Sequence, residues 1–364
     1  MSTAYSGDNI TFPDASVQNT APKTGMVNRI INGDMRIDQR NAGAEVNPAV
    51  SGIYYLDRYT TQSGAASKFK IGQNAGAVTP PTGFINYLGC TSLSAYTVGA
   101  SEAFNIQQRI EGLNVADLAW GTASASSVTL SFWVYSSLTG TFGGFVNNSA
   151  STRSYPFSYS ISSANTWTQI SVTIAGDTSG TWLTTSGIFA IVGFSLGAGA
   201  TSSGTAGAWG STNYRSATGA VSVVGTSGAT FYITGVQLEA GSVATPFERR
   251  FYGQELQLAQ RYYWRTTGDD FAGIGAGTVR TSTAARAVIV NPTPMRAKPS
   301  ISIAGSLGGS AGGAVLTITT IAAAWSGVVS SMTEFYVSGA TTGQGFIIHH
   351  LDNTSNYFQC DAEL

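Results

Sequence analysis

The feature that most constrains this chain is an alternation of apolar and polar side chains, repeated many times between segments rich in Gly, Ser and Asn. Over residues 128–135, one set of alternate positions is apolar: Val128, Leu130, Phe132 and Val134. Successive side chains of a strand point to opposite faces, so this pattern predicts a strand with one buried face. It recurs over residues 170–174, 188–196 and 231–238. Many short strands of this kind predict a sandwich or jelly roll.

One strand shows a break in phase. Phe231 and Ile233 alternate up to Gly235, and Val236 and Leu238 then continue on the shifted phase. A single extra residue in one strand of a pair produces this shift, and glycine often marks its position. A β-bulge is therefore predicted at Gly235.

Helical spacing appears once, over residues 251–265, where Tyr252, Leu256, Ala259 and Tyr263 recur on one helix face. A second, shorter helix is predicted over residues 114–118, with Asn114 as its N-cap. Alternation restarts after residue 266. The predicted fold is all-β: a jelly-roll β-sandwich, a short helix and a second, smaller β-sandwich-like domain. The predicted boundaries are 1–24 for an N-terminal extended docking segment, 25–250 for the jelly roll, 251–265 for the connecting helix and 266–364 for the C-terminal β domain.

The charge of the chain limits its partners. Charged residues make up 10% of the 364 residues, against about 25% in ordinary soluble domains, and the net charge is −1. The scattered Lys and Arg form no basic stripe, so no nucleic-acid partner is expected. So few charges protect a surface poorly against self-association, which favours a homo-oligomer. No apolar run is long enough for membrane insertion. Cys90 and Cys360 are predicted to be isolated buried thiols, with a disulfide as the less favoured alternative.

Sugar rings stack on aromatic side chains while neutral polar groups bind their hydroxyls. The loop that best combines both groups contains Trp209, Asn213, Tyr214 and Arg215, and the further candidates are Trp182 and Trp120. For any single Trp the alternative is packing over the open end of the sandwich, which the general preference of Trp for burial favours. Trp133 and Trp167 lie in or beside strand patterns and are assigned to packing.

No catalytic residues are predicted. A glycoside hydrolase needs two opposed carboxylates, and the first domain offers only a few acidic residues. These include Glu102, Asp57 and Asp117, and also Glu111, which alternates with Arg109 as a strand-surface pair would. His349 and His350 are adjacent in a strand and point to opposite faces, so they cannot act as a pair.

Several motifs resemble those of known proteins. The segment 10–14, with Gln18 and Ala21, is similar to a short leader at the front of tailed-phage fibre proteins. The segments 28–34, 37–40 and 55–59 resemble the opening of a carbohydrate-binding jelly-roll module of phage tail-fibre and virion-appendage proteins. Further matching segments are 108–112, 130–134, 153–157, 204–209, 235–241 and 244–250. The resemblance covers residues 26–265 and is loose beyond them.

This resemblance implies a virion protein, assembled in the host cytoplasm and exposed outside, that forms a homotrimer when it builds a fibre. It implies adhesion to host-surface glycans and contact with other virion proteins through the N-terminal segment. Relatives of this type often hold a structural calcium, to which Asn32 and Asp34 could contribute. The closing strand, 233–236, lacks the acidic residues of those relatives, so no metal or other cofactor is expected. The alternatives are a purely structural capsid-decoration, neck or baseplate protein and, less favoured, a polysaccharide depolymerase.

Overall fold

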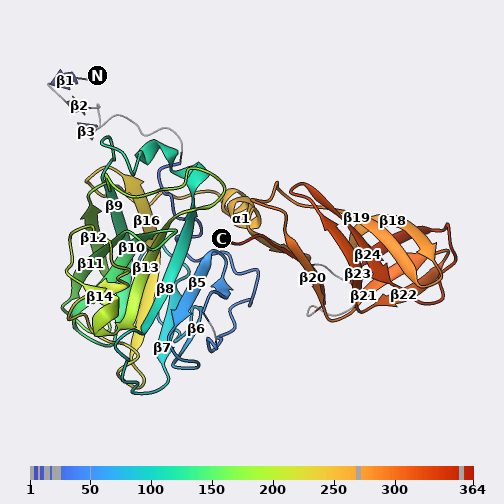
Figure 1. Cartoon of the computed structure of the whole chain (residues 1–364), viewed down its shortest axis with the longest axis horizontal. Coiled ribbons are helices and arrows are strands. Elements are labelled where there is room, and N and C mark those ends of the chain that lie inside the picture. The colour runs from blue at the N-terminus through green and yellow to red at the C-terminus, as the bar shows by residue number, and fades with distance from the viewer. Residues whose placement is uncertain are drawn as a thin grey trace.

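A computed structural model describes residues 26–49, 51–267, 272–351 and 356–364, with three short strands near the N-terminus. These strands are β1 (Ala4–Ser6), β2 (Asn9–Thr11) and β3 (Val17–Gln18), which pair as a small antiparallel sheet. The predicted docking role of residues 1–24 lies for the most part outside the described residues. Figure 1 shows two β bodies, the larger from the first part of the chain and the smaller from the last, with a helix between them.

The larger body is a sandwich of two antiparallel sheets, which confirms the predicted jelly roll. The six-stranded sheet has the order β11-β10-β13-β8-β5-β4, and the five-stranded sheet has the order β12-β9-β16-β7-β6. The first contains β4 (Tyr54–Leu56), β5 (Tyr59–Ser63), β8 (Ala103–Glu111), β10 (Gly140–Asn148), β11 (Ser154–Ile161) and β13 (Ile188–Ala198). The second contains β6 (Phe69–Gln73), β7 (Leu88–Ser92), β9 (Val128–Ser136), β12 (Thr168–Ile174) and β16 (Thr230–Ala240).

The core between the sheets is built from the predicted apolar positions. The alternate residues of β9, from Val128 to Val134, are all buried there, together with Phe194 of β13. The predicted bulge in β16 is also confirmed, because the pairing with β9 shifts register between Thr234 and Gln237. Gly235 has φ +60° at this point, a conformation that favours glycine. The bulge returns the next apolar side chain of β16 to the core.

The helices differ from the prediction. Helix α1 spans Tyr252–Gln260 rather than 251–265, because β17 (Tyr263–Arg265) pairs with the last strand of the chain. Long-range strand pairing outweighs helical spacing here. The predicted helix at 114–118 is instead two 3₁₀ turns, η1 (Gly112–Asn114) and η2 (Ala116–Leu118), and Asn114 caps neither. No described helix is long and apolar enough to cross a membrane.

The C-terminal body confirms the predicted second, smaller β domain. Its seven-stranded sheet has the order β22-β21-β25-β18-β19-β24-β23 and shares one core with the three-stranded sheet β17-β26-β20. The larger sheet contains β18 (Gly273–Thr281), β19 (Ala284–Val290), β21 (Leu307–Ala311), β22 (Ala314–Ile318), β23 (Ile321–Ser326), β24 (Ser330–Tyr336) and β25 (Gly345–His349). The smaller one adds β20 (Ser300–Ala304) and β26 (Tyr357–Asp361) to β17. Cys90 and Cys360 are buried and unpaired, as predicted.

The end of the chain returns to the junction of the two bodies, as the C label in Figure 1 shows. The Glu363 carboxylate contacts the guanidinium groups of Arg40 and Arg58, and both ends of the Arg58 pair are almost fully buried. Arg296 donates hydrogen bonds to the main-chain oxygens of Ala362 and Glu363, at 2.8 and 2.9 Å. Buried charge pairs of this kind hold two elements in one geometry.

A second pair, with its acidic end buried, joins the helix region to the six-stranded sheet. The carboxylate of Glu111, at the end of β8, lies 2.6 Å from Arg261 and accepts a hydrogen bond of 2.5 Å from the Tyr262 hydroxyl. The predicted pairing of Glu111 with Arg109 is therefore wrong. Its carboxylate is fully buried and is neutralised by a residue 150 positions away, a pairing that strand alternation cannot reveal.

Candidate functional site

The three candidate tryptophans, predicted from separate loops, gather in one cluster at an end of the sandwich. The ring centroids of Trp120 and Trp182 are 4.7 Å apart, and each lies 5.3 Å from Trp209. Phe189 of β13 completes the cluster, with its ring 5.2 Å from Trp120 and 5.0 Å from Trp182. Edge-to-face arrangements predominate, as expected for aromatic rings that pack on one another.

Two of these rings are used in packing. Trp120 and Trp182 are only 5% and 7% exposed, and their indole N–H groups donate to the main-chain oxygens of Ser126 and Ser179. Trp209 is partly exposed, and its N–H donates to the Ala175 oxygen at 2.7 Å. For Trp120 and Trp182 the geometry matches the packing alternative, whereas Trp209 and the residues after it remain accessible.

The segment after Trp209 lies across the outer face of the six-stranded sheet. It is flanked by the short parallel strands β14 (Ser203–Gly204) and β15 (Ser216–Ala217). Gly143 of β10 permits the close approach, because a Cβ there would overlap the Ser216 hydroxyl and lie 2.8 Å from the Ala217 nitrogen. Asn213 is exposed, and its side chain lies 2.8 Å from that of Asn147. Tyr214 is partly buried against Gly204.

Arg215, the last of the candidate residues, forms one wall of a cleft of about 260 Å³ on this outer face. The cleft is lined by Ser51, Gly52, Thr61, Gln62, Gln107, Arg109, Ile191 and Arg215. Its floor comes from β8 and β13, where Gln107 pairs with Gly193 and Arg109 pairs with Ile191. The lining contains two guanidinium groups and two amides but no carboxylate, so the cleft can donate several hydrogen bonds to one ligand.

The two arginines of the cleft have few partners. Arg215 donates to the Ser151 hydroxyl at 3.2 Å and lies over the Phe145 ring, 5.0 Å from its centroid. Arg109 donates to the main-chain oxygen of Leu364. Burial, and then the nearby charge of Arg109, lower the pKa of Arg215 to about 10, so its side chain still carries a charge at neutral pH.

Gln107, on the cleft floor, was not predicted as a binding residue. It is 5% exposed, and its Oε1 atom is buried without a hydrogen-bond partner among the described residues. The sequence contains a signal for it: in residues 103–111 the apolar positions Phe104, Ile106 and Ile110 face the core, whereas Gln107 and Arg109 lie on the opposite face. Amide and guanidinium groups on the outer face of a strand are typical of a surface that binds polar ligands.

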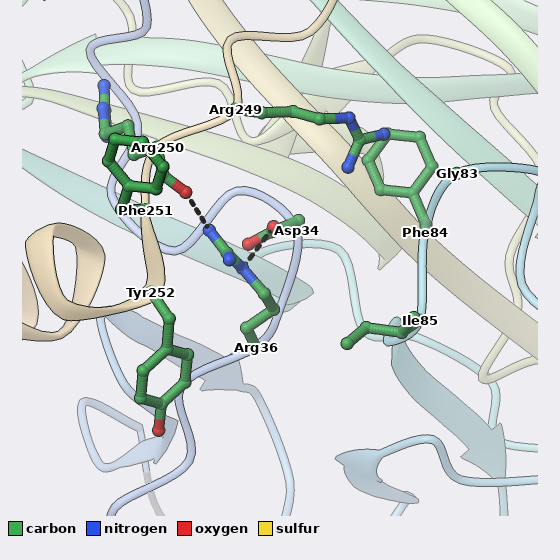
Figure 2. Close-up of a pocket in the computed structure, with 9 residues that line it drawn as sticks. All are labelled: Asp34, Arg36, Gly83, Phe84, Ile85, Arg249, Arg250, Phe251 and Tyr252. Carbon is green, nitrogen blue, oxygen red and sulfur yellow. Dashed lines mark hydrogen bonds and ion pairs between the residues drawn. The ribbon is translucent and has the colours of Figure 1, made fainter.

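A second hollow, of about 380 Å³, lies where the first loops meet the start of α1 (Figure 2). Arg36 crosses it, paired with Asp34 at 2.5 Å and donating to the Arg250 oxygen at 2.9 Å. Its wall on the helix side carries the aromatic rings of Phe251 and Tyr252, which are 87% and 56% exposed. Arg36 and Arg250 are ion-paired, and Arg249 lies over the ring of Phe84, so the rest of the surface is mainly apolar.

The remaining acidic candidates serve local structure. Glu102 accepts hydrogen bonds from the Tyr96 hydroxyl and the Gly99 nitrogen, and Asp117 pairs with Arg29 at 2.6 Å. The buried Asp57 accepts two hydrogen bonds from Gln39, both of 2.6 Å.

The calcium candidates are engaged in other contacts. Asn32 bonds through its amide to the main chain of Ile37 and Asp57, and Asp34 pairs with Arg36. Over the described ranges no group of three or more His, Cys, Asp or Glu could hold a metal ion.

Comparison with known proteins gives structural likeness only. No family model and no curated protein matches the chain. The enzymatically active domain of tailspike protein 4 from bacteriophage CBA120 matches with a TM-score of 0.31 and 11% identity, over 59% of this chain and 22% of that chain. A CBM4 structure matches with a TM-score of 0.29 and 12% identity, over 58% and 98%. The CBM22-1 xylan-binding domain of Paenibacillus barcinonensis Xyn10C matches with a TM-score of 0.27 and 10% identity, over 56% and 99%. At this level the matches assign no family, and the function must be argued from the residues of the chain.

Proposed function

We propose that this protein is a glycan-binding subunit of a bacteriophage virion, a tail fibre or appendage that attaches the particle to sugars of the host surface. The observation that carries the glycan-binding part is the open polar cleft on the outer face of the six-stranded sheet, with Arg215 at its wall and Gln107 on its floor. The virion part rests on the sequence motifs described above, as do the trimer and the docking role of the N-terminal segment.

The cleft has the chemistry that saccharide recognition requires. Sugar hydroxyls bind amide and guanidinium groups in a shallow, largely preformed site. Gln107 offers an unused acceptor, Oε1, and Gln62 lies beside it with its own oxygen accepting from Asn105 at 3.0 Å. A volume of about 260 Å³ is slightly below the ~300–1,000 Å³ usual for small-ligand sites and fits one or two sugar rings of a longer chain. Binding at one such site would be weak, and several copies on one particle would raise the avidity.

We propose binding without catalysis and without a metal or other cofactor. No carboxylate lines the cleft, and a glycosidase needs two across the scissile bond. The test of this part is incubation of the protein with polysaccharides that it binds, followed by measurement of reducing ends. Their release would overturn the non-catalytic proposal.

The binding proposal is tested on a glycan array with the purified full chain and two variants. Gln107→Ala removes the amide on the cleft floor and should reduce binding by about tenfold, the usual loss for one or two hydrogen bonds to a neutral ligand. The matched control is Gln169→Ala, an exposed Gln on the five-stranded sheet, which should bind as the wild type does. Absence of any glycan binding by the folded wild type would refute the proposal.

A purely structural virion role is a second candidate, because one observation favours it. The hollow in Figure 2 exposes Phe251 and Tyr252, with Ile85 73% exposed on the other side. Contiguous exposed apolar side chains are typical of surfaces that contact another protein. If glycans do not bind, labelling of the subunit on purified particles should then locate this surface within an assembly.

A further inference from the structure

We infer that the cleft on the six-stranded sheet binds an acidic saccharide, whose anionic group lies between Arg109 and Arg215. This inference rests on the proposed glycan-binding function and specifies its ligand class. It is argued from the charges around the cleft, from the contacts that the two arginines lack, and from the neutral groups beside them.

The cleft concentrates positive charge on a chain that has little charge. Lys and Arg number 18 among 364 residues, yet two guanidinium groups line this one cleft without a carboxylate in the lining. They are close enough for the charge of Arg109 to disfavour the charged form of Arg215. Arg109 donates to an oxygen of Leu364, whereas Arg215 has no acidic partner among the described residues. An anion placed between the two guanidinium groups would offset the repulsion between their charges.

Several partly buried arginines elsewhere in the described chain are matched with acids, although Arg265 and Arg296 donate to main-chain oxygens instead. Arg153 forms two hydrogen bonds of 2.7 Å with Asp177, and Arg261 pairs with Glu111 at 2.6 Å. For Arg215 the contacts among the described residues are the Ser151 hydroxyl and the Phe145 ring, with no acid, and its Nε atom is buried without a hydrogen-bond partner. The Nε atom of Arg109 is in the same state. The Nε atoms of the ion-paired Arg40 and Arg58 are also without a hydrogen bond, so the feature that distinguishes Arg215 is its lack of an acidic partner among the described residues.

The geometry of guanidinium groups favours a planar or tetrahedral anion. A guanidinium group presents a rigid fork of donors that matches carboxylate and phosphate oxygens in pairs. A free anion would need only the arginines, but Gln107 places a buried, unpartnered amide oxygen on the same floor, where it can accept only from a donor such as a sugar hydroxyl. Charge and acceptor together point to a sugar that carries an acid group, such as a uronic acid or a phosphorylated or sulfated sugar.

The test compares matched pairs of probes with the full chain. Hyaluronan and its carboxyl-reduced form share a backbone and differ in charge, and sulfated and unsulfated dextran form a second pair. A glycan array with acidic and neutral saccharides covers other backbones. We expect the acidic member to bind at least tenfold more tightly, and its binding to weaken as NaCl rises from 50 to about 500 mM, because salt screens exposed charges. The hyaluronan pair tests a carboxylate and the dextran pair tests a sulfate, so the two pairs together show which anionic group the cleft binds.

The variant Arg215→Gln should lower affinity for acidic saccharides by about tenfold or more, the loss expected for a charge-assisted hydrogen bond, and leave binding of neutral ones within twofold. Arg280→Gln is the charge-matched control, because it removes one positive charge from an exposed arginine in the C-terminal body. If Arg215→Gln does not fold, the comparison of probe pairs on the wild type decides the question alone.

The outcomes separate this inference from the proposed function. Equal binding of acidic and neutral saccharides, or binding of neutral ones alone, overturns the acidic ligand and leaves the glycan-binding function in place. If Arg280→Gln weakens the binding of acidic saccharides as much as Arg215→Gln does, the effect is one of net charge. That result overturns the placement of the ligand in the cleft. No binding on the array overturns the proposed function, and this inference with it.

Discussion

Asp57 provides the sharpest test of the energetics of the fold, because a buried carboxyl makes stability depend on pH. Burial raises the pKa of Asp57 from 3.8 to about 7, although Arg40 and the hydrogen bonds from Gln39 act in the opposite direction. The folded protein therefore keeps a proton that the unfolded chain releases near pH 4. Stability should fall as pH rises through the window between these two values, since the unfolded state binds fewer protons there.

The magnitude follows from the size of the shift. A difference of about three pKa units corresponds to about 4 kcal/mol once the pH exceeds the pKa of the folded state. About 2–3 kcal/mol of this loss in the free energy of unfolding occurs between pH 5 and pH 8. Asp57→Asn cannot ionise and avoids the penalty, but it loses the hydrogen bond from the Gln39 main-chain nitrogen, which costs about 1–3 kcal/mol. The variant should be close to wild type in stability at pH 5 and more stable at pH 8.

The assay is urea unfolding at several pH values between 5 and 8, followed by Trp fluorescence, with the free energy of unfolding compared between wild type and variant. Asp117→Asn is the control, because it removes a carboxylate that is 54% exposed at the surface, where it pairs with Arg29. A difference between Asp57→Asn and wild type that stays constant across this range would refute the reasoning. It would mean that Gln39 and Arg40 stabilise the ionised carboxylate as strongly as burial destabilises it.

Three further substitutions test other parts of the structure. Trp120→Ala should destabilise the jelly roll by about 3–5 kcal/mol in urea unfolding, because it leaves a cavity beside Trp182 and Phe189. Gly143→Val should displace the Trp209–Arg215 segment through its clash with the Ser216 hydroxyl, which faster proteolysis there would report. Glu363→Gln should lower the free energy of unfolding by about 3–5 kcal/mol, because it leaves the buried Arg58 without its carboxylate. A change below 1 kcal/mol would count against either stability prediction.

The strands could be predicted from sequence because their signal is local. Val128 and Leu130 are buried as the alternation requires, and the change of phase at Gly235 is a real bulge. The end of helix α1 could not be predicted in this way. Tyr263 continues the helical spacing but pairs with Asp361 in a sheet, and the energy of that pairing depends on a residue almost 100 positions away.

The candidate site was only partly predictable for the same reason. Exposed polar loops can be recognised in the sequence, and Arg215 was identified from its loop. That Trp120, Trp182 and Trp209 form one cluster follows only from the fold, which brings three separate loops to the same end of the sandwich. Arg109 lies in strand β8. Whether the outer face of this strand contacts solvent, another layer or a ligand depends on the loop that packs over the six-stranded sheet.

The position of Arg109 connects the proposed cleft to the junction of the two bodies. Its guanidinium group lines the cleft and also donates to the main-chain oxygen of Leu364, beside the Glu363 carboxylate that contacts Arg58. Two bodies joined by a short helix alone would be expected to move relative to each other. Here the returning chain end forms buried ion pairs with the jelly roll, and those contacts also fix one of the two cationic groups of the cleft. The segment that follows the last strand of the C-terminal body thus contributes a contact to the proposed ligand site.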